Sequence, residues 1–118
     1  MNILLAEDAH ESLNLITRYL HLGGHTVETV TDGLKALQRM KSSKFDLLIT
    51  DKAMPQMNGN ALAKEAKKAY PDIVVIMLTG FGDFMQLTAD EEANIDLVLR
   101  KPLTKKELID AIASLFAK

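Results

Sequence analysis

The chain contains no cysteine among its 118 residues. Disulfide bonds, thiol nucleophiles and zinc sites built on thiolates are therefore excluded. No apolar run approaches the roughly 20 residues that a membrane-spanning helix needs, and Glu7 and Asp8 come too early for a secretory signal peptide. An excess of positive charge is also missing, because the net charge is -2 and the pI is near 5.9. We therefore expect no general basic surface for nucleic acid or anionic membrane.

What is present is the composition of an ordinary globular protein, with 47% hydrophobic and 25% charged residues. A chain of this length can bury a substantial core within one domain. The sequence shows no internal repeat, no low-complexity segment and no linker. We expect a soluble, cytoplasmic protein that forms a single domain over residues 1–118.

Short apolar runs alternate along the chain with segments of helical periodicity. The runs at 45–50 and 73–78 are nearly continuous in apolar residues, which is typical of strands buried on both faces. Alternating strands and helices predict an α/β fold with a parallel sheet covered by helices on both faces. The predicted strands are 3–6, 25–30, 45–50, 73–78 and 95–99, and the predicted helices are about 11–22, 34–40, 61–69, 84–92 and 104–115.

Local signals refine two of these helices. Thr104 and Glu107 have the spacing of a capping box, which predicts that the last helix begins there. Residues at helical spacing are predicted to face the core in the second and last helices, namely Leu34, Leu37, Met40, Leu108, Ile112 and Leu115.

Polar or charged residues stand at the ends of four predicted strands. Glu7 and Asp8 follow the first strand, Asp51 follows the third, Thr79 follows the fourth, and Lys101 follows the fifth. Because the carboxyl ends of parallel strands meet at one edge of a sheet, these residues are expected to converge. Aspartate is also common at strand-to-helix turns, so Asp51 taken alone could simply cap the next helix.

The chemistry of the converging residues favours a site. Three crowded carboxylates repel one another and do not all stay ionised unaided. A hard divalent cation, Mg²⁺ or Mn²⁺, removes the conflict, because such ions prefer oxygen ligands. The ammonium of Lys101 and the hydroxyl of Thr79 then suit a phosphoryl group. We predict that the site places a metal ion and a phosphoryl group against Asp51, which acts as the nucleophile.

From Ile3 to Phe116, the sequence resembles the receiver domain of two-component response regulators. The resemblance implies a flavodoxin-like fold, a doubly wound (βα)5 sandwich with a parallel five-stranded sheet in the order 2-1-3-4-5. It rests on the order and spacing of Glu7-Asp8, Asp51 with Met54-Pro55 and Gly59 behind it, Thr79 followed by a small residue, and Lys101-Pro102.

The resemblance also implies roles for these residues. Asp51 would be phosphorylated by a phosphohistidine of a sensor histidine kinase or a histidine phosphotransfer protein. Thr79 would donate a hydrogen bond to the phosphoryl group, and Lys101 would form an ion pair with it. The Lys101–Pro102 peptide bond would be cis, which only an X-Pro bond adopts cheaply. The magnesium ligands would be Glu7, Asp8, Asp51 and the backbone carbonyl of Ala53.

Such a domain is a switch rather than an enzyme, although it assists its own phosphorylation and dephosphorylation. It would signal through a phosphorylation-dependent contact with a protein target that the sequence does not identify. We expect no contact of the domain with nucleic acid or membrane. The switch region would comprise Thr79, position 98 and Pro102.

The sequence departs from the family pattern at the switch and at the rim of the site. Val98 stands three residues before Lys101, where family members commonly carry an aromatic or histidine ring that swings inward on activation. Ala53 and Phe81 lie two residues after Asp51 and Thr79, and neither offers a polar group to orient a hydrolytic water. The resemblance therefore does not carry the ring-based switch over to this chain, and a long-lived phosphorylated state is expected.

Two alternatives assign the site a different function. A magnesium-dependent phosphohydrolase with an aspartyl-phosphate intermediate needs a second acid shortly after the nucleophile, but no acid occurs between Asp51 and Glu65. A flavin-binding module needs a phosphate-cradling loop after the first strand, and the acids at positions 7 and 8 would repel a phosphate there.

Overall fold

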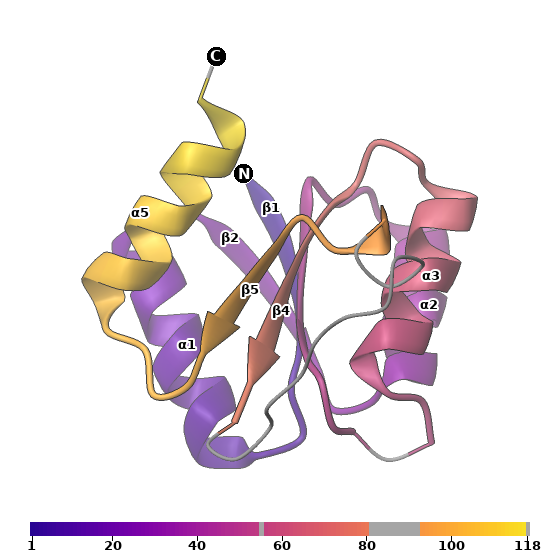
Figure 1. The fold of residues 1–118 in the computed structure, drawn as a ribbon, viewed down its shortest axis with the longest axis horizontal. Coiled ribbons are helices and arrows are strands. Elements are labelled where there is room, and N and C mark those ends of the chain that lie inside the picture. Colours follow the sequence, from indigo (N-terminus) through magenta and orange to yellow (C-terminus); the bar gives the residue numbers. More distant parts are fainter. Residues whose placement is uncertain (55, 81–92, 118) are drawn as a thin grey trace.

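The computed structural model describes residues 1–54, 56–80 and 93–117. Their five strands form one parallel sheet in the order β2-β1-β3-β4-β5 (Figure 1). Helices α1 and α5 cover one face of the sheet, and α2 and α3 cover the other. The predicted flavodoxin-like fold class is thereby confirmed. The predicted helix over 84–92 lies outside the described residues. The elements are β1 (Asn2–Ala6), α1 (His10–Leu22), β2 (Thr26–Val30), α2 (Gly33–Ser42), β3 (Leu47–Asp51), α3 (Gly59–Ala69), β4 (Val74–Thr79), β5 (Leu97–Arg100) and α5 (Lys105–Phe116).

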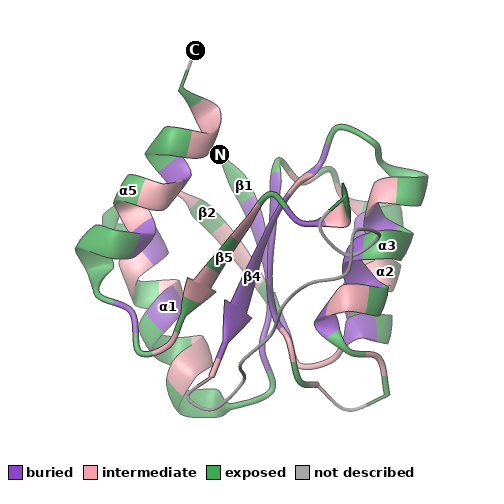
Figure 2. Ribbon diagram, viewed as in Figure 1, coloured by how far each residue is buried: buried purple, intermediate pink, exposed green. Residues whose placement is uncertain are grey.

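The central strands are buried because they face helices on both sides. Along β1, Ile3 and Leu5 pack into the core beneath α1 and α5, whereas Leu4 and Ala6 pack into the core beneath α2 and α3. This alternation follows from the two-residue period of a strand. Every residue of β3 is buried, and so is β4 beyond Val74 (Figure 2), as expected for runs of apolar residues in a parallel sheet.

Three helices begin at capping side chains. The side chains of Asp32 and Asn58 each accept a hydrogen bond from the backbone amide three residues later, both over 2.8 Å. Both thereby satisfy one of the free amides of a helix N-terminus. Thr104 and Glu107 form the predicted capping box at the start of α5.

The inward face of α2 differs from the prediction. Leu34 is 45% exposed, because the buried stripe of α2 runs along Gly33, Ala36 and Met40. At 3.6 residues per turn, Leu34 lies roughly a third of a turn from the centre of that stripe. The strand boundaries also move by one or two residues: β1 begins at Asn2, β2 at Thr26 and β4 at Val74, while β3 spans Leu47–Asp51 and β5 spans Leu97–Arg100.

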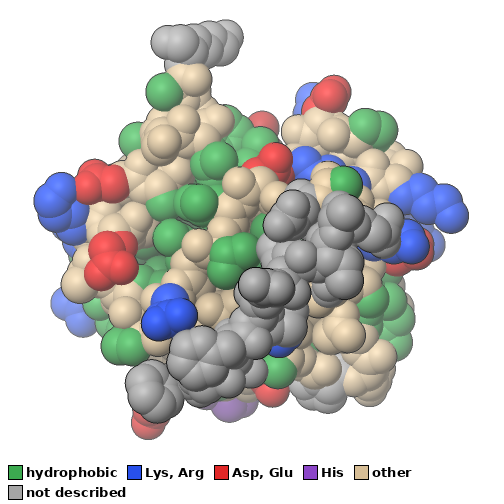
Figure 3. All heavy atoms as spheres, viewed as in Figure 1, with side chains coloured by type: hydrophobic (Ala, Val, Ile, Leu, Met, Phe, Trp, Pro, Cys, Tyr) green, Lys and Arg blue, Asp and Glu red, His purple; other side chains and the backbone are tan. Residues whose placement is uncertain are grey.

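The described surface carries charges of both signs. Figure 3 shows acidic and basic side chains beside one another over α5, where Lys106 donates to Asp110 over 2.7 Å. Among the described helices, none has the length and apolarity needed to cross a membrane.

Candidate functional site

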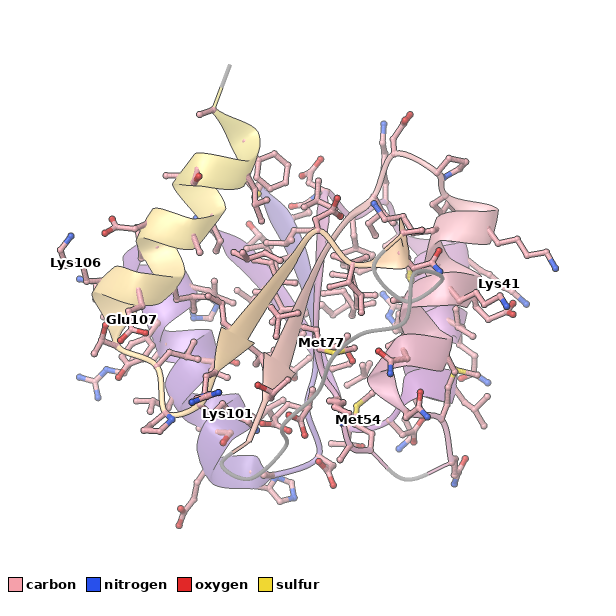
Figure 4. All side chains as sticks on the ribbon, in the orientation of Figure 1. Lys41, Met54, Met77, Lys101, Lys106 and Glu107 are labelled. Atoms are coloured by element: carbon pink, nitrogen blue, oxygen red, sulfur yellow. The ribbon has the colours of Figure 1, made fainter. Side chains whose placement is uncertain are left out.

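The predicted site residues meet at the carboxyl edge of the sheet. Strand β3 ends at Asp51, which pairs in register with Leu78, and β4 ends one residue later at Thr79. Lys101 directly follows β5, and in Figure 4 its side chain lies near the arrowheads of β4 and β5. Parallel pairing therefore brings together residues that are distant in the sequence, as predicted.

Asp51 does not cap a helix. The N-cap of α3 is Asn58, so the alternative role considered for Asp51 does not apply. Asp51 is 8% exposed, so it is largely buried but retains some contact with solvent. The backbones of Asp51 and Gly59 pack closely, because a Cβ added at Gly59 would overlap the Asp51 carbonyl oxygen. The amide of Gly59 also donates to the carbonyl of Lys52 over 2.8 Å.

Lys101 bridges two carboxylates. Its Nζ lies 2.6 Å from Oε1 of Glu7 and 3.0 Å from Oδ1 of Asp51. Its backbone amide donates to the carbonyl of Thr79 over 2.7 Å, and its peptide bond to Pro102 is cis, as the resemblance implies. Thr79 is 7% exposed at the end of β4. The ammonium, the acid and the threonine are thus held at one place.

The proximity of these charges changes their proton affinities. Burial, together with the charges of Glu7 and Asp8, raises the pKa of Asp51 from 3.8 to about 6, although the hydrogen bond from Lys101 opposes the change. Burial lowers the pKa of Lys101, but its bonds to Glu7 and Asp51 outweigh burial and raise the pKa above its ordinary value. The Asp51 carboxyl therefore keeps its proton to a higher pH than an exposed aspartate, and the raised pKa of Lys101 keeps its ammonium protonated beside it.

The acids fit a divalent cation. One carboxylate oxygen from each of Glu7, Asp8 and Asp51 lies within 4.8 Å of the others. Glu7 is fully buried, and its Oε2 has no hydrogen-bond partner among the described residues. A buried carboxylate oxygen without a donor is costly, and a hard cation with retained waters would satisfy it. The residues therefore fit Mg²⁺ or Mn²⁺, whereas the contribution of the Ala53 carbonyl stays a prediction.

The residues of the switch and of the rim are only partly described. Val98 lies on β5 and is 39% exposed, with no ring that could turn toward Thr79. Ala53 is exposed beside the site. Phe81 lies outside the described residues.

One contact was not predicted from the sequence. Glu7 and Lys101 are 94 residues apart, and no local pattern connects them. The available signal was the length of the glutamate side chain, which reaches one methylene further than the aspartate beside it.

Comparisons with known proteins agree with this geometry. The model of the response regulator receiver domain family matches residues 3–113. The chain belongs to the response regulator receiver domain family. This receiver domain is 35% identical over 111 residues to the response regulator receiver protein CpdR of Brucella abortus, with 93% of the chain and 92% of that protein covered. It is 34% identical to the transcriptional regulatory protein CpxR homolog of Haemophilus influenzae, of which it spans 50% while 98% of the chain is covered.

Solved structures show the same fold. A response regulator receiver domain protein from Clostridium thermocellum is 31% identical, with a TM-score of 0.87 over 96% of this receiver domain and 91% of that chain. A putative response regulator from Chloroflexus aurantiacus is 26% identical, with a TM-score of 0.90 over 99% of this domain and 98% of that chain. Receiver domains are regulatory phosphoacceptors of two-component systems, and they bind Mg²⁺ at an acidic pocket.

Proposed function

We propose that this receiver domain is a phosphoacceptor switch in which Asp51 receives a phosphoryl group from a histidine kinase or a histidine phosphotransfer protein. The observation that carries the proposal is the position of Lys101, whose ammonium lies 3.0 Å from Asp51 at the edge of an acidic cluster. A lysine placed there balances the charge that an arriving phosphoryl group brings.

The transfer requires little of the protein beyond positioning. A carboxylate oxygen of Asp51 forms a bond to phosphorus while the bond from phosphorus to the histidine nitrogen breaks. The electron pair of that broken bond stays on the imidazole. Lys101 pairs with a phosphoryl oxygen, and Thr79 donates its hydroxyl hydrogen to another. A bound Mg²⁺, held by Glu7, Asp8, Asp51 and the Ala53 carbonyl, would neutralise charge on the phosphoryl oxygens.

The signal is proposed to leave through a protein contact. Val98 on β5 has no ring to move between a buried and an exposed position, so the signal is proposed to rest on Thr79 rather than on position 98. We propose that the phosphorylated state binds a target protein in the cytoplasm and that the domain itself contacts neither nucleic acid nor membrane.

The test is a mass measurement after incubation with acetyl phosphate and Mg²⁺. The wild type should gain one phosphoryl group, whereas Asp51→Asn keeps the side-chain shape, lacks the nucleophile and should gain none. Asp72→Asn is the matched control, because Asp72 is an exposed aspartate before β4, at the opposite edge of the sheet. A phosphoryl gain on Asp51→Asn would show that the assignment is wrong.

The phosphohydrolase alternative is less well supported. The described residues after Asp51, up to the start of α3, include no acid that could protonate a leaving group. Release of inorganic phosphate from small phosphate esters over many turnovers, lost in Asp51→Asn, would favour the alternative instead.

A further inference from the structure

The ammonium of Lys101 lies closer to Glu7 than to Asp51. The two separations are 2.6 Å and 3.0 Å, so the shorter ion pair is the one with the residue that is not phosphorylated. The Glu7 side chain is fully buried, whereas the Lys101 side chain is 20% exposed. The anchored partner of this ion pair is therefore Glu7, and the partner with freedom to move is Lys101.

Glu7 depends on this contact. A buried carboxylate is costly unless it is paired and hydrogen-bonded. Oε1 of Glu7 accepts from Lys101, and its Oε2 has no partner in the part of the chain that the structure describes. Lys101 is the cation paired with this charge among the described ion pairs. The same ammonium is thereby held beside Asp51 in the metal-free protein.

We propose that Glu7 is a positioning residue, which holds Lys101 at the place where the phosphoryl group arrives, in addition to facing the metal ion. The inference rests on the proposed function and assigns Glu7 an action through Lys101. Phosphorylation then moves the ammonium from the two carboxylates onto a phosphoryl oxygen. The lysine is preorganised for this contact, because its ammonium already lies beside Asp51 before the phosphoryl group arrives.

The length of the glutamate separates this role from metal binding. Aspartate at position 7 keeps the charge but withdraws the carboxylate by about 1.5 Å, the length of one carbon–carbon bond. Lys101 can then reach either position 7 or Asp51 within hydrogen-bond distance, but not both. Mg²⁺ tolerates the change, because it retains waters that fill a longer gap.

The first measurement follows Lys101 directly. In protein labelled with ¹³C at the lysine ε-carbons and kept in chelator, the Lys101 resonance is assigned by its loss in Lys101→Arg. We expect Glu7→Asp to move this resonance toward the position of exposed lysines. Glu28→Asp is the matched control, because it shortens the partner of Arg39 in an ion pair between β2 and α2 and should leave the Lys101 resonance unchanged.

The second measurement separates positioning from metal binding. We expect Glu7→Asp to slow phosphorylation by acetyl phosphate about tenfold, while the Mg²⁺ dissociation constant from calorimetry changes less than about threefold. Glu7→Gln keeps the length and an acceptor oxygen, so its Lys101 resonance should stay closer to the wild-type position than that of Glu7→Asp.

Three results would overturn the inference. One is a Lys101 resonance that Glu7→Asp leaves in place, and another is a loss of Mg²⁺ affinity as large as the loss of rate. The third is a loss of the folded amide spectrum in both Glu7 variants, which would assign Glu7 a role in stability alone. Failure of the wild type to gain a phosphoryl group would instead overturn the proposed function, and the resonance would still report the Glu7–Lys101 contact.

Discussion

The backbone amide of Lys101 donates a hydrogen bond to the carbonyl oxygen of Thr79 over 2.7 Å. This bond extends the pairing of β4 and β5 beyond Thr79 and Arg100, the last residues in register. The hydroxyl and the ammonium that are proposed to hold the phosphoryl group therefore belong to one hydrogen-bonded backbone unit. The position of one strand end therefore depends on that of the other.

The raised pKa of Asp51 predicts a pH-dependent stability. Burial raises the pKa from 3.8 to about 6 in the folded protein. As the pH rises, the unfolded chain therefore loses this proton first, near pH 4, and the folded protein loses it near pH 6. Between these two pH values the folded state becomes less stable relative to the unfolded state. Relative to Asp51→Asn, the free energy of unfolding in chelator should fall by up to about 3 kcal/mol over this range. Urea unfolding of both proteins across the range checks this, and parallel profiles would contradict it.

Asp8 is expected to matter for the metal more than for the fold. Its side chain is exposed, and its carboxylate adds repulsion to Glu7 and Asp51. Asp8→Ala should raise the melting temperature slightly in chelator and abolish phosphorylation in Mg²⁺. The rise in melting temperature that Mg²⁺ gives the wild type should disappear, because a ligand stabilises only the state that binds it. Asp72→Ala is the control, and an equal Mg²⁺ response in all three proteins would refute the prediction.

Gly59 is expected to tolerate no side chain. A Cβ there would overlap the carbonyl of Asp51, which is part of the central strand β3 and cannot move freely. Gly59→Ala should cost about 1–3 kcal/mol by overpacking. Gly33→Ala is the matched comparison, since Gly33 also begins a helix but its Cβ would first meet the Cβ of Met57, at 2.9 Å, rather than a strand carbonyl. Equal losses in denaturant unfolding would show that the strand carbonyl is not the cause.

The lifetime of the phosphorylated state should depend on position 53. A hydrolytic water needs a polar neighbour to orient it, and the exposed side chain of Ala53 offers none. Ala53→Asn should therefore speed dephosphorylation, by about tenfold. The check is a time course of phosphoryl loss after removal of the donor, with Ala61→Asn on α3 as the control. A wild-type decay that Ala53→Asn leaves unaltered would remove the basis of this prediction.

A ring at position 98 should act on binding rather than on lifetime. Val98 is 39% exposed on β5, so Val98→Tyr adds a ring without filling the core. The stability should change by less than about 0.5 kcal/mol, as is usual for surface substitutions. Affinity for the target protein should change more than the rate of phosphoryl loss. The opposite ranking in a binding assay and a decay time course would place position 98 in the hydrolytic path.

Much of the fold followed from residue patterns. The apolar runs of β3 and β4 predicted buried parallel strands, and Thr104 with Glu107 predicted the start of α5. Leu34 was wrongly predicted to face the core. Periodicity shows that a helix has a buried stripe, but it does not locate the centre of the stripe when small residues such as Gly33 and Ala36 form part of it.

The composition of the site was also predictable, but its internal pairing was not. Parallel topology alone brings Glu7, Asp51 and Lys101 to one edge. Which carboxylate holds the ammonium depends on side-chain reach and burial, and both are set by tertiary packing. The reach of Glu7 could be read from the sequence, whereas its complete burial could not.

Glu7, Asp51 and Lys101 all lie at one edge of the sheet. The opposite edge is therefore available for attaching a probe. Lys44 is exposed between α2 and β3. Because strands rise about 3.3 Å per residue, Lys44 lies on the order of 15 Å or more from Asp51 at the far end of β3. The chain has no native thiol, so Lys44→Cys would carry the single reactive sulfur. A fluorophore attached there would report, through its anisotropy, the slower tumbling of the domain when a target binds. It would not contact the phosphoryl pocket.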